Sequence, residues 1–148
     1  MGCTEPICLA YAAAKAHEIL GTMPKRVEIK ASGNIIKNVK SVIVPNTKGM
    51  KGLKASVAAG IVAGNPKKAL EVIAEVTPEQ KKAIAEFLDN TLMTVVPLNI
   101  IAQLDVTVTL YTEEHSASVE QHLVVLFHLH DIGVEACDAH AGGVLFCI

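Results

Sequence analysis

The spacing of hydrophobic and polar positions predicts that helices dominate the first part of the chain. Residues 5–20 carry apolar side chains at helical intervals among many alanines, and Gly21 follows as a helix stop. Residues 26–31 alternate strictly between charged and apolar side chains, which predicts a half-buried strand. Residues 32–34 predict a turn, and residues 41–44 predict a second short strand.

Three consecutive helices are predicted next. The first covers the small and apolar residues 53–63, and the second covers residues 66–76, after an asparagine N-cap and with a proline in its first turn. The third begins with a capping box made by Thr77 and Gln80 and ends near residue 90. All three carry enough apolar positions to pack on another element.

The pattern then changes to strands. Residues 104–111 alternate strictly, with Val106 and Val108 directed inward and Asp105 outward, and residues 116–120 continue after a turn. Residues 123–129 and 144–148 are further apolar stretches. Because the helices form a block instead of alternating with strands, we expect an α+β fold. A block of helices packs on a mainly antiparallel or mixed sheet, in a single domain over residues 1–148.

Composition and charge exclude several classes of protein. Of the 148 residues 51% are hydrophobic, 3% are aromatic, and the net charge is −2, so neither a phosphate-tracking surface nor a base-stacking surface is expected. No apolar run reaches the roughly 18 residues of a membrane span, and no signal peptide is recognised. Four cysteines are too few for a disulfide scaffold, which favours a cytoplasmic protein.

The candidate chemistry begins at Cys3. Thr4 is suited to cap the first helix, Glu5 complements its dipole and Pro6 fits its first turn, so Cys3 is placed where a thiolate is stabilised. An ordinary buried cysteine beside a well-capped helix explains the same residues. Since a reactive cysteine rarely lies at a fraying end, the motif also suggests that the sequence belongs to a longer parent protein.

Other candidate residues carry weaker patterns. The glycine- and lysine-rich residues 47–52 fit no phosphate-loop motif, and a loop covering a site or a solvated loop is preferred. Cys8 is predicted to be a small core residue. A zinc site in the last third would need converging ligands, but the spacings there are irregular, so surface histidines and core cysteines are preferred. The residues concerned are His122, His128, His130, Cys137, His140 and Cys147.

Several motifs in order resemble a known family. They are the sequence GCTEPI at residues 2–7 with the alanine-rich helix after it, SGNIIKN at 32–38, VP at 44–45 followed by Gly49, and GNP at 64–66. Together they resemble the N-terminal part of the L-cysteine desulfidase family, which is related to the α chain of iron–sulfur L-serine dehydratases. The resemblance covers about residues 2–120.

The resemblance implies an iron–sulfur-dependent amino-acid lyase. Such an enzyme converts L-cysteine to pyruvate, ammonia and sulfide, or dehydrates and deaminates L-serine, with a 4Fe–4S cluster on three cysteines and without pyridoxal phosphate. Cys3 matches the N-terminal cluster cysteine of the family and would bind iron. As a hypothesis, substrate binding falls to the polar residues of the two main motifs. These are Thr4, Glu5, Ser32, Asn34, Lys37 and Asn38.

Two departures from the family limit this expectation. Family members are several times longer, and residues 121–148 depart from the family pattern. We therefore expect the N-terminal portion of a longer lyase, with an incomplete cluster and no turnover unless a missing helical region or second subunit is supplied. The competing hypothesis is a non-catalytic binding or assembly domain that pairs with a separate subunit or self-associates as a homo-oligomer, without nucleic acid or membrane partners.

Overall fold

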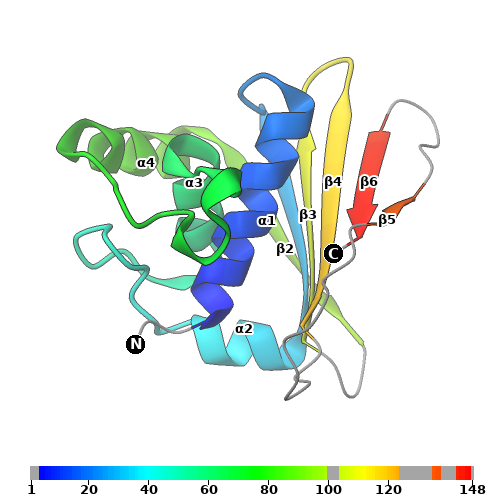
Figure 1. The fold of residues 1–148 in the computed structure, drawn as a ribbon. Helices are drawn as coiled ribbons and strands as arrows, with labels where there is room; N and C mark the ends of the chain where they lie inside the picture. Colours follow the sequence, from blue (N-terminus) through cyan, green and yellow to red (C-terminus); the bar gives the residue numbers. More distant parts are fainter. Residues whose placement is uncertain (1–3, 100–103, 124–134, 138–142, 148) are drawn as a thin grey trace.

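The computed structural model describes residues 4–99, 104–123, 135–137 and 143–147, and within them the predicted α+β class is confirmed. In this described part of the chain, six strands form one mixed sheet in the order β2-β1-β3-β4-β6-β5. The pairs β1–β2 and β4–β6 are parallel, whereas β1–β3, β3–β4 and β5–β6 are antiparallel. The helices lie on one face of this sheet (Figure 1).

The bounds of the elements follow the predicted pattern in most places. The helices are α1 (Thr4–Leu20), α2 (Gly33–Val39), α3 (Gly52–Ala63), the 3₁₀ helix η1 (Pro66–Glu71) and α4 (Pro78–Asn90). The strands are β1 (Arg26–Ser32), β2 (Leu92–Leu98), β3 (Leu104–Tyr111), β4 (Ser116–Leu123), β5 (Glu135–Cys137) and β6 (Gly143–Cys147). The predicted strand over 123–129 lies mainly outside the described residues.

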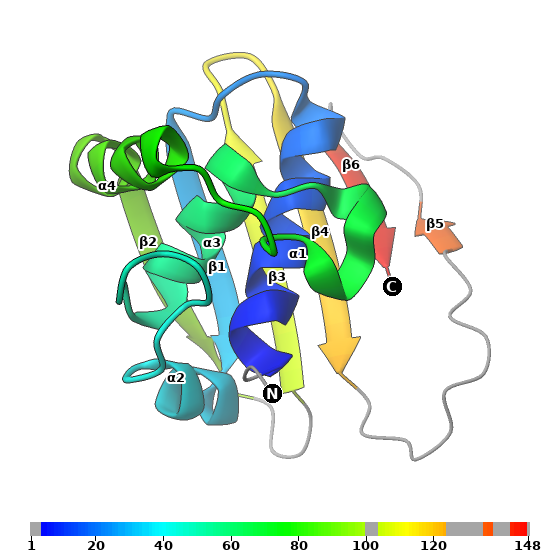
Figure 2. The same ribbon diagram turned by 60° about the vertical axis from the view of Figure 1, so that its left-hand side comes forward.

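Helix α1 is alanine-rich because it is buried on two sides. It packs on β3 and β4 with one face and on α3 with another, so it lies between the sheet and an outer helix (Figures 1 and 2). Small side chains allow both neighbours to come close. The helix ends at Gly21, whose φ of 75° and hydrogen bond to the carbonyl of His17 form the expected left-handed stop. Its fully buried alanines are Ala10, Ala12, Ala13 and Ala16.

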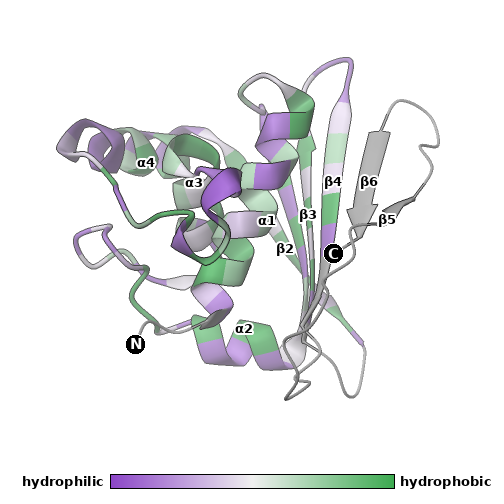
Figure 3. Cartoon of the chain, in the orientation of Figure 1, coloured by the Kyte–Doolittle hydropathy of each residue, from purple (hydrophilic) through white to green (hydrophobic). Residues whose placement is uncertain are grey.

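The core lies between the helices and the sheet. Val27 and Ile29 of β1 and Val106 and Val108 of β3 are completely buried, as the alternating pattern predicts. Hydrophobic positions accordingly alternate with polar ones along β1 and β3 (Figure 3). Asp105, predicted to point outward, is instead buried, which alternation alone does not predict.

Two local predictions between β1 and α3 are wrong. Residues 32–34 do not form a turn; Ser32 ends β1, and α2 begins at Gly33. This helix has fewer than two full turns, so its apolar face, Ile35 and Val39, is too short for its periodicity to be recognised. Residues 41–44 do not form a strand either, because only Ile43 pairs with Lys51, in an isolated bridge.

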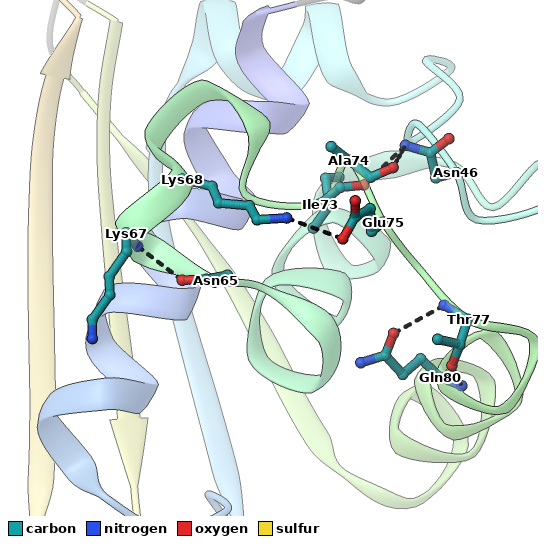
Figure 4. A network of polar contacts seen from close by, with 9 residues as sticks. All are labelled: Asn46, Asn65, Lys67, Lys68, Ile73, Ala74, Glu75, Thr77 and Gln80. Atoms are coloured by element: carbon teal, nitrogen blue, oxygen red, sulfur yellow. Dashed lines mark hydrogen bonds and ion pairs between the residues drawn. The ribbon is translucent and has the colours of Figure 1, made fainter.

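The helix predicted over residues 66–76 is shorter than expected. Asn65 is the predicted N-cap, with its side chain accepting a hydrogen bond from the backbone of Lys67 (Figure 4), but the positive φ of Ala69 interrupts the helical backbone. Beyond the interruption at Ala69, Leu70 points outward and is 71% exposed, whereas Val72 is buried. Intrinsic propensity therefore predicts the start of this helix but not its length.

The capping box of α4 is present as predicted. Thr77 accepts a hydrogen bond from the backbone of Gln80, and the Gln80 side chain accepts one from the backbone of Thr77, at 3.2 and 2.9 Å (Figure 4). The box fixes where α4 begins, and Ile84 and Phe87 then enter the core.

Candidate functional site

Helices α1 and α3 run side by side in the same direction. A Cβ atom on Gly60 would overlap the backbone of Ala10, and one on Gly64 would lie 2.7 Å from the Cβ of Ala14. The two contacts are four residues apart in both helices, so the helices are parallel and their backbones nearly touch. The first turns of α1 and α3 therefore lie at the same end of the molecule, where α2 also lies (Figures 1 and 2).

A loop at residues 45–51 lies at the same end of the molecule as these helix turns, and polar contacts hold it in place. The Asn46 side-chain amide donates to the carbonyls of Ile73 and Ala74 at 2.9 and 3.1 Å (Figure 4). The buried hydroxyl of Thr47 donates to the carbonyl of Val44 at 2.7 Å. We call the first turns of α1 and α3, helix α2 with its C-cap Lys40, and this loop the cationic end.

Positive charge is concentrated at the cationic end. Residues 29–70 contain no aspartate or glutamate but carry eight lysines. Exposed lysines and two helix N-termini produce a positive potential there that attracts anions. The lysines that belong to the cationic end are all exposed: Lys37, Lys40, Lys48, Lys51 and Lys54.

The structure brings three predicted substrate-binding residues together. Asn34, Lys37 and Asn38 have the spacing of one helix face and are all exposed on α2, opposite the buried Ile35 and Val39. An amide, an ammonium and a second amide thus share one surface of the cationic end. They are donors of the kind that bind a carboxylate.

Ser32 differs from these residues because it is buried. Its side chain is at the β1–α2 junction with 1% exposure, and its hydroxyl makes no hydrogen bond within the part of the chain that the structure describes. It also does not cap α2, although it occupies the N-cap position. A buried hydroxyl without a partner costs about 1–3 kcal/mol, which a bound polar group would offset.

The predicted residues at the start of the chain are only partly described. Cys3 and the Thr4 side chain lie outside the described residues, but α1 begins at Thr4, directly after Cys3. Glu5 is half-buried in the first turn of α1, where an acidic side chain stabilises the helix dipole. The sequence alone did not predict α2, the burial of Ser32 or the parallel pairing of α1 and α3.

Cys8 is buried, as predicted. Burial raises the pKa of its thiol from 9.0 to about 12, with a smaller contribution from the negative charge of Glu5. At pH 8 the fraction of thiolate is therefore about a thousandfold lower than for an unperturbed thiol. Cys8 is not suited to bind a metal or attack a substrate.

We expect Cys8 to resist alkylation. In a variant with Cys3, Cys137 and Cys147 replaced by serine, iodoacetamide at pH 8 should modify the native protein at least a hundredfold more slowly than the urea-unfolded protein, because only the thiolate reacts. Mass spectrometry over time measures both rates. Equal rates would contradict the burial and the raised pKa.

The described residues do not fit a complete metal or cluster site. Among them no group of three or more histidine, cysteine, aspartate or glutamate side chains converges. The side chains considered as zinc ligands in the last third, from His122 to Cys147, for which surface histidines and core cysteines were preferred, lie outside the described ones. Cys3 could supply one cluster ligand, and further ligands would have to come from elsewhere.

Comparison with known proteins finds relatives that are much longer than this chain. A UPF0597 protein of Desulfitobacterium hafniense is 46% identical over 135 residues, which are 91% of this chain and 31% of the relative. A UPF0597 protein of Finegoldia magna is 49% identical over 121 residues, 81% of this chain and 29% of the relative. In Fusobacterium nucleatum, another is 55% identical over 92 residues, 62% of this chain and 22% of the relative.

The chain thus spans about a third or less of the length of the curated relatives that it matches. No family model matches the chain, and no solved structure matches it. Within the described residues, no helix is long and apolar enough to cross a membrane.

These findings correct the family resemblance drawn from the motifs. The relatives at 46–55% identity are named UPF0597 proteins, and none of them carries the name of an L-cysteine desulfidase or an L-serine dehydratase. The assignment to the L-cysteine desulfidase family is therefore wrong. Short motifs of glycine, proline and polar residues agree with more than one family, whereas identity over most of the chain is a stricter test.

Proposed function

We propose that this chain is the substrate-binding part of a longer iron–sulfur-dependent amino-acid lyase, which cleaves L-cysteine to pyruvate, ammonia and sulfide or dehydrates and deaminates L-serine. The proposal does not depend on a family name. It is supported chiefly by the geometry of the cationic end. The N-termini of α1 and α3 lie together there with exposed lysines, and α1 begins directly after Cys3 in the chain.

The substrate carboxylate is assigned to the exposed face of α2. The Lys37 ammonium supplies the opposite charge, and the Asn34 and Asn38 amides supply hydrogen bonds. The buried Ser32 hydroxyl, which has no partner among the described residues, is free to bind a substrate polar group. Zwitterionic amino acids are attracted by their carboxylate, and residues 29–70 contribute no acidic side chain that would compete with it, although Glu5 lies in the first turn of α1.

Cys3 is assigned as one ligand of the cluster. Its position before α1 favours the thiolate, which is the form that binds iron. Because the described residues lack the remaining ligands, these belong to other residues of the longer protein or to a second subunit. This division of ligands agrees with a chain that spans only a third of its longer relatives.

The test uses a full-length chimera in which this chain replaces the matched region of the Desulfitobacterium hafniense relative. Purified without oxygen, the chimera should show the broad absorption of an iron–sulfur cluster near 400 nm and release pyruvate from L-cysteine or L-serine. Cys3→Ala should abolish both, whereas Cys8→Ala should keep the absorption. Unchanged absorption in Cys3→Ala would remove Cys3 from the ligand set.

The Ser32→Ala variant distinguishes a role of the Ser32 hydroxyl in substrate binding from a role in protein stability. Because the Ser32 hydroxyl has no hydrogen bond to lose within the described chain, the variant should be as stable as the wild type or up to about 3 kcal/mol more stable, while the KM of the chimera rises about tenfold. A fall in stability with an unchanged KM would show a structural hydroxyl and contradict the assignment.

A second candidate is a non-catalytic binding or assembly domain. It is favoured by exposed large hydrophobic side chains, of which Met23, Leu70 and Leu92 are 47%, 71% and 65% exposed. Such a domain should associate with another subunit or with itself. A monodisperse monomer in light scattering, together with an active chimera, would count against it.

A further inference from the structure

An apolar hollow lies at the end of the helices opposite the cationic end. Its volume is about 360 Å³, and its apolar wall comes from the segment after α1, the last turn of α3 and the inner face of α4. Its lining includes the buried Phe87, the half-buried Val62 and Ala83 and the exposed Met23. Two exposed polar residues of α4, Glu86 and Asn90, also line it, and we call them its rim. We call it the α4 hollow.

The surface beside the α4 hollow also carries exposed apolar side chains that another protein segment could cover. Met23 is 47% exposed although it lines the hollow, and Leu92, which follows the lining residue Thr91, is 65% exposed. Leu92 begins β2, which is the edge strand of the sheet in the described part of the chain. A seven-residue edge strand next to exposed apolar side chains is a surface that proteins usually cover.

Charge around the hollow indicates what can cover it. Glu86 lies on the rim and Asp89 is exposed on the same helix, whose last turn has no basic residue. The C-terminal end of α4 adds partial negative charge. Glu86 has Lys82 one turn away, at 3.9 Å, which neutralises it only partly. An apolar side chain flanked by lysine or arginine therefore fits the hollow and its rim.

We propose that the α4 hollow is the docking site for the remaining part of the longer protein, through a segment that places an apolar side chain in the hollow and a basic side chain beside Glu86. The relatives supply the occupant, because more than two thirds of the Desulfitobacterium hafniense relative lies outside the matched region. The inference is independent of the lyase chemistry, since the hollow and the cationic end lie at opposite ends of α1.

Hydrogen exchange tests the docking site. In the full-length chimera, the backbone amides of residues 83–96 should exchange at least about tenfold more slowly than in the 148-residue chain alone, because the docked segment covers α4 and the edge of β2. Met23→Glu and Ala83→Glu should each restore fast exchange in the chimera, since a carboxylate then enters the hollow near Glu86. The matched control is Leu70→Glu, which introduces the same charge at an exposed leucine of η1 and should leave the protection unchanged.

Three outcomes would overturn the proposal. Equal exchange in the chimera and the isolated chain would show that nothing docks there. Protection that is lost equally in Leu70→Glu would show a general charge effect. Concentration-dependent protection in the isolated chain would assign the hollow to a second copy. None of these results depends on a bound cluster, so failure of this proposal is distinguishable from failure of the lyase.

Discussion

Gly60→Ala is expected to destabilise the protein by about 3 kcal/mol, although alanine is the better helix former. In an exposed helix the same change stabilises by about 1 kcal/mol. Here the new methyl group would overlap the carbonyl oxygen of Ala10 and lie 2.8 Å from its Cα atom. Because these are backbone atoms, they cannot rotate away, and α1 and α3 must separate. Urea unfolding followed by circular dichroism measures the loss.

Gly33→Ala is the matched control, because a Cβ at this position meets nothing within 4 Å. Its stability should stay within about 1 kcal/mol of the wild type. The double variant Ala10→Gly/Gly60→Ala should remain destabilised, since removing the Ala10 methyl group leaves its carbonyl in place. Recovery in the double variant, or equal effects of Gly60→Ala and Gly33→Ala, would refute the close parallel pairing of the two helices.

Ile29→Ala is expected to cost about 3–4 kcal/mol. Ile29 is completely buried in β1, between β2 and β3, and its side chain faces the helices. The substitution removes three buried carbons and leaves a cavity that a strand with neighbours on both sides cannot close. The free energy of unfolding from urea titration measures the loss.

Ile43→Ala provides the same chemical change on the surface. Ile43 is 54% exposed and keeps its backbone bridge to Lys51 after the substitution, so the loss should stay below about 1 kcal/mol. A similar loss of stability for Ile29→Ala and Ile43→Ala would mean that burial does not decide the cost of the substitution. It would contradict the position of Ile29 in the core.

Local patterns predicted the elements whose features lie within a few residues. Helix α4 has a capping box and an apolar face within thirteen residues, and β1 and β3 alternate cleanly, so each was identified from its own residues. Short elements were not identified in this way. Helix α2 has only seven residues, and a glycine at its start made the same residues look like a turn.

The candidate site shows the same limit. The sequence singled out Ser32, Asn34, Lys37 and Asn38 by a motif, but not that three share an exposed helix face and the fourth is buried. The family suggested by the motif was wrong, whereas the site residues remain a prediction. The α4 hollow was not predicted at all, because its lining comes from three segments that are distant in the sequence.

Sequence was sufficient for the fold class, the α1, α3 and α4 helices and the alternating strands, because periodicity and caps depend on neighbouring residues. Tertiary structure decided the parallel α1–α3 pair, the position of the lysine-rich segment beside the first turns of these helices, and the hollow at the other end. These features depend on contacts between residues far apart in the chain, such as Ala10 and Gly60, whose close approach no local pattern records.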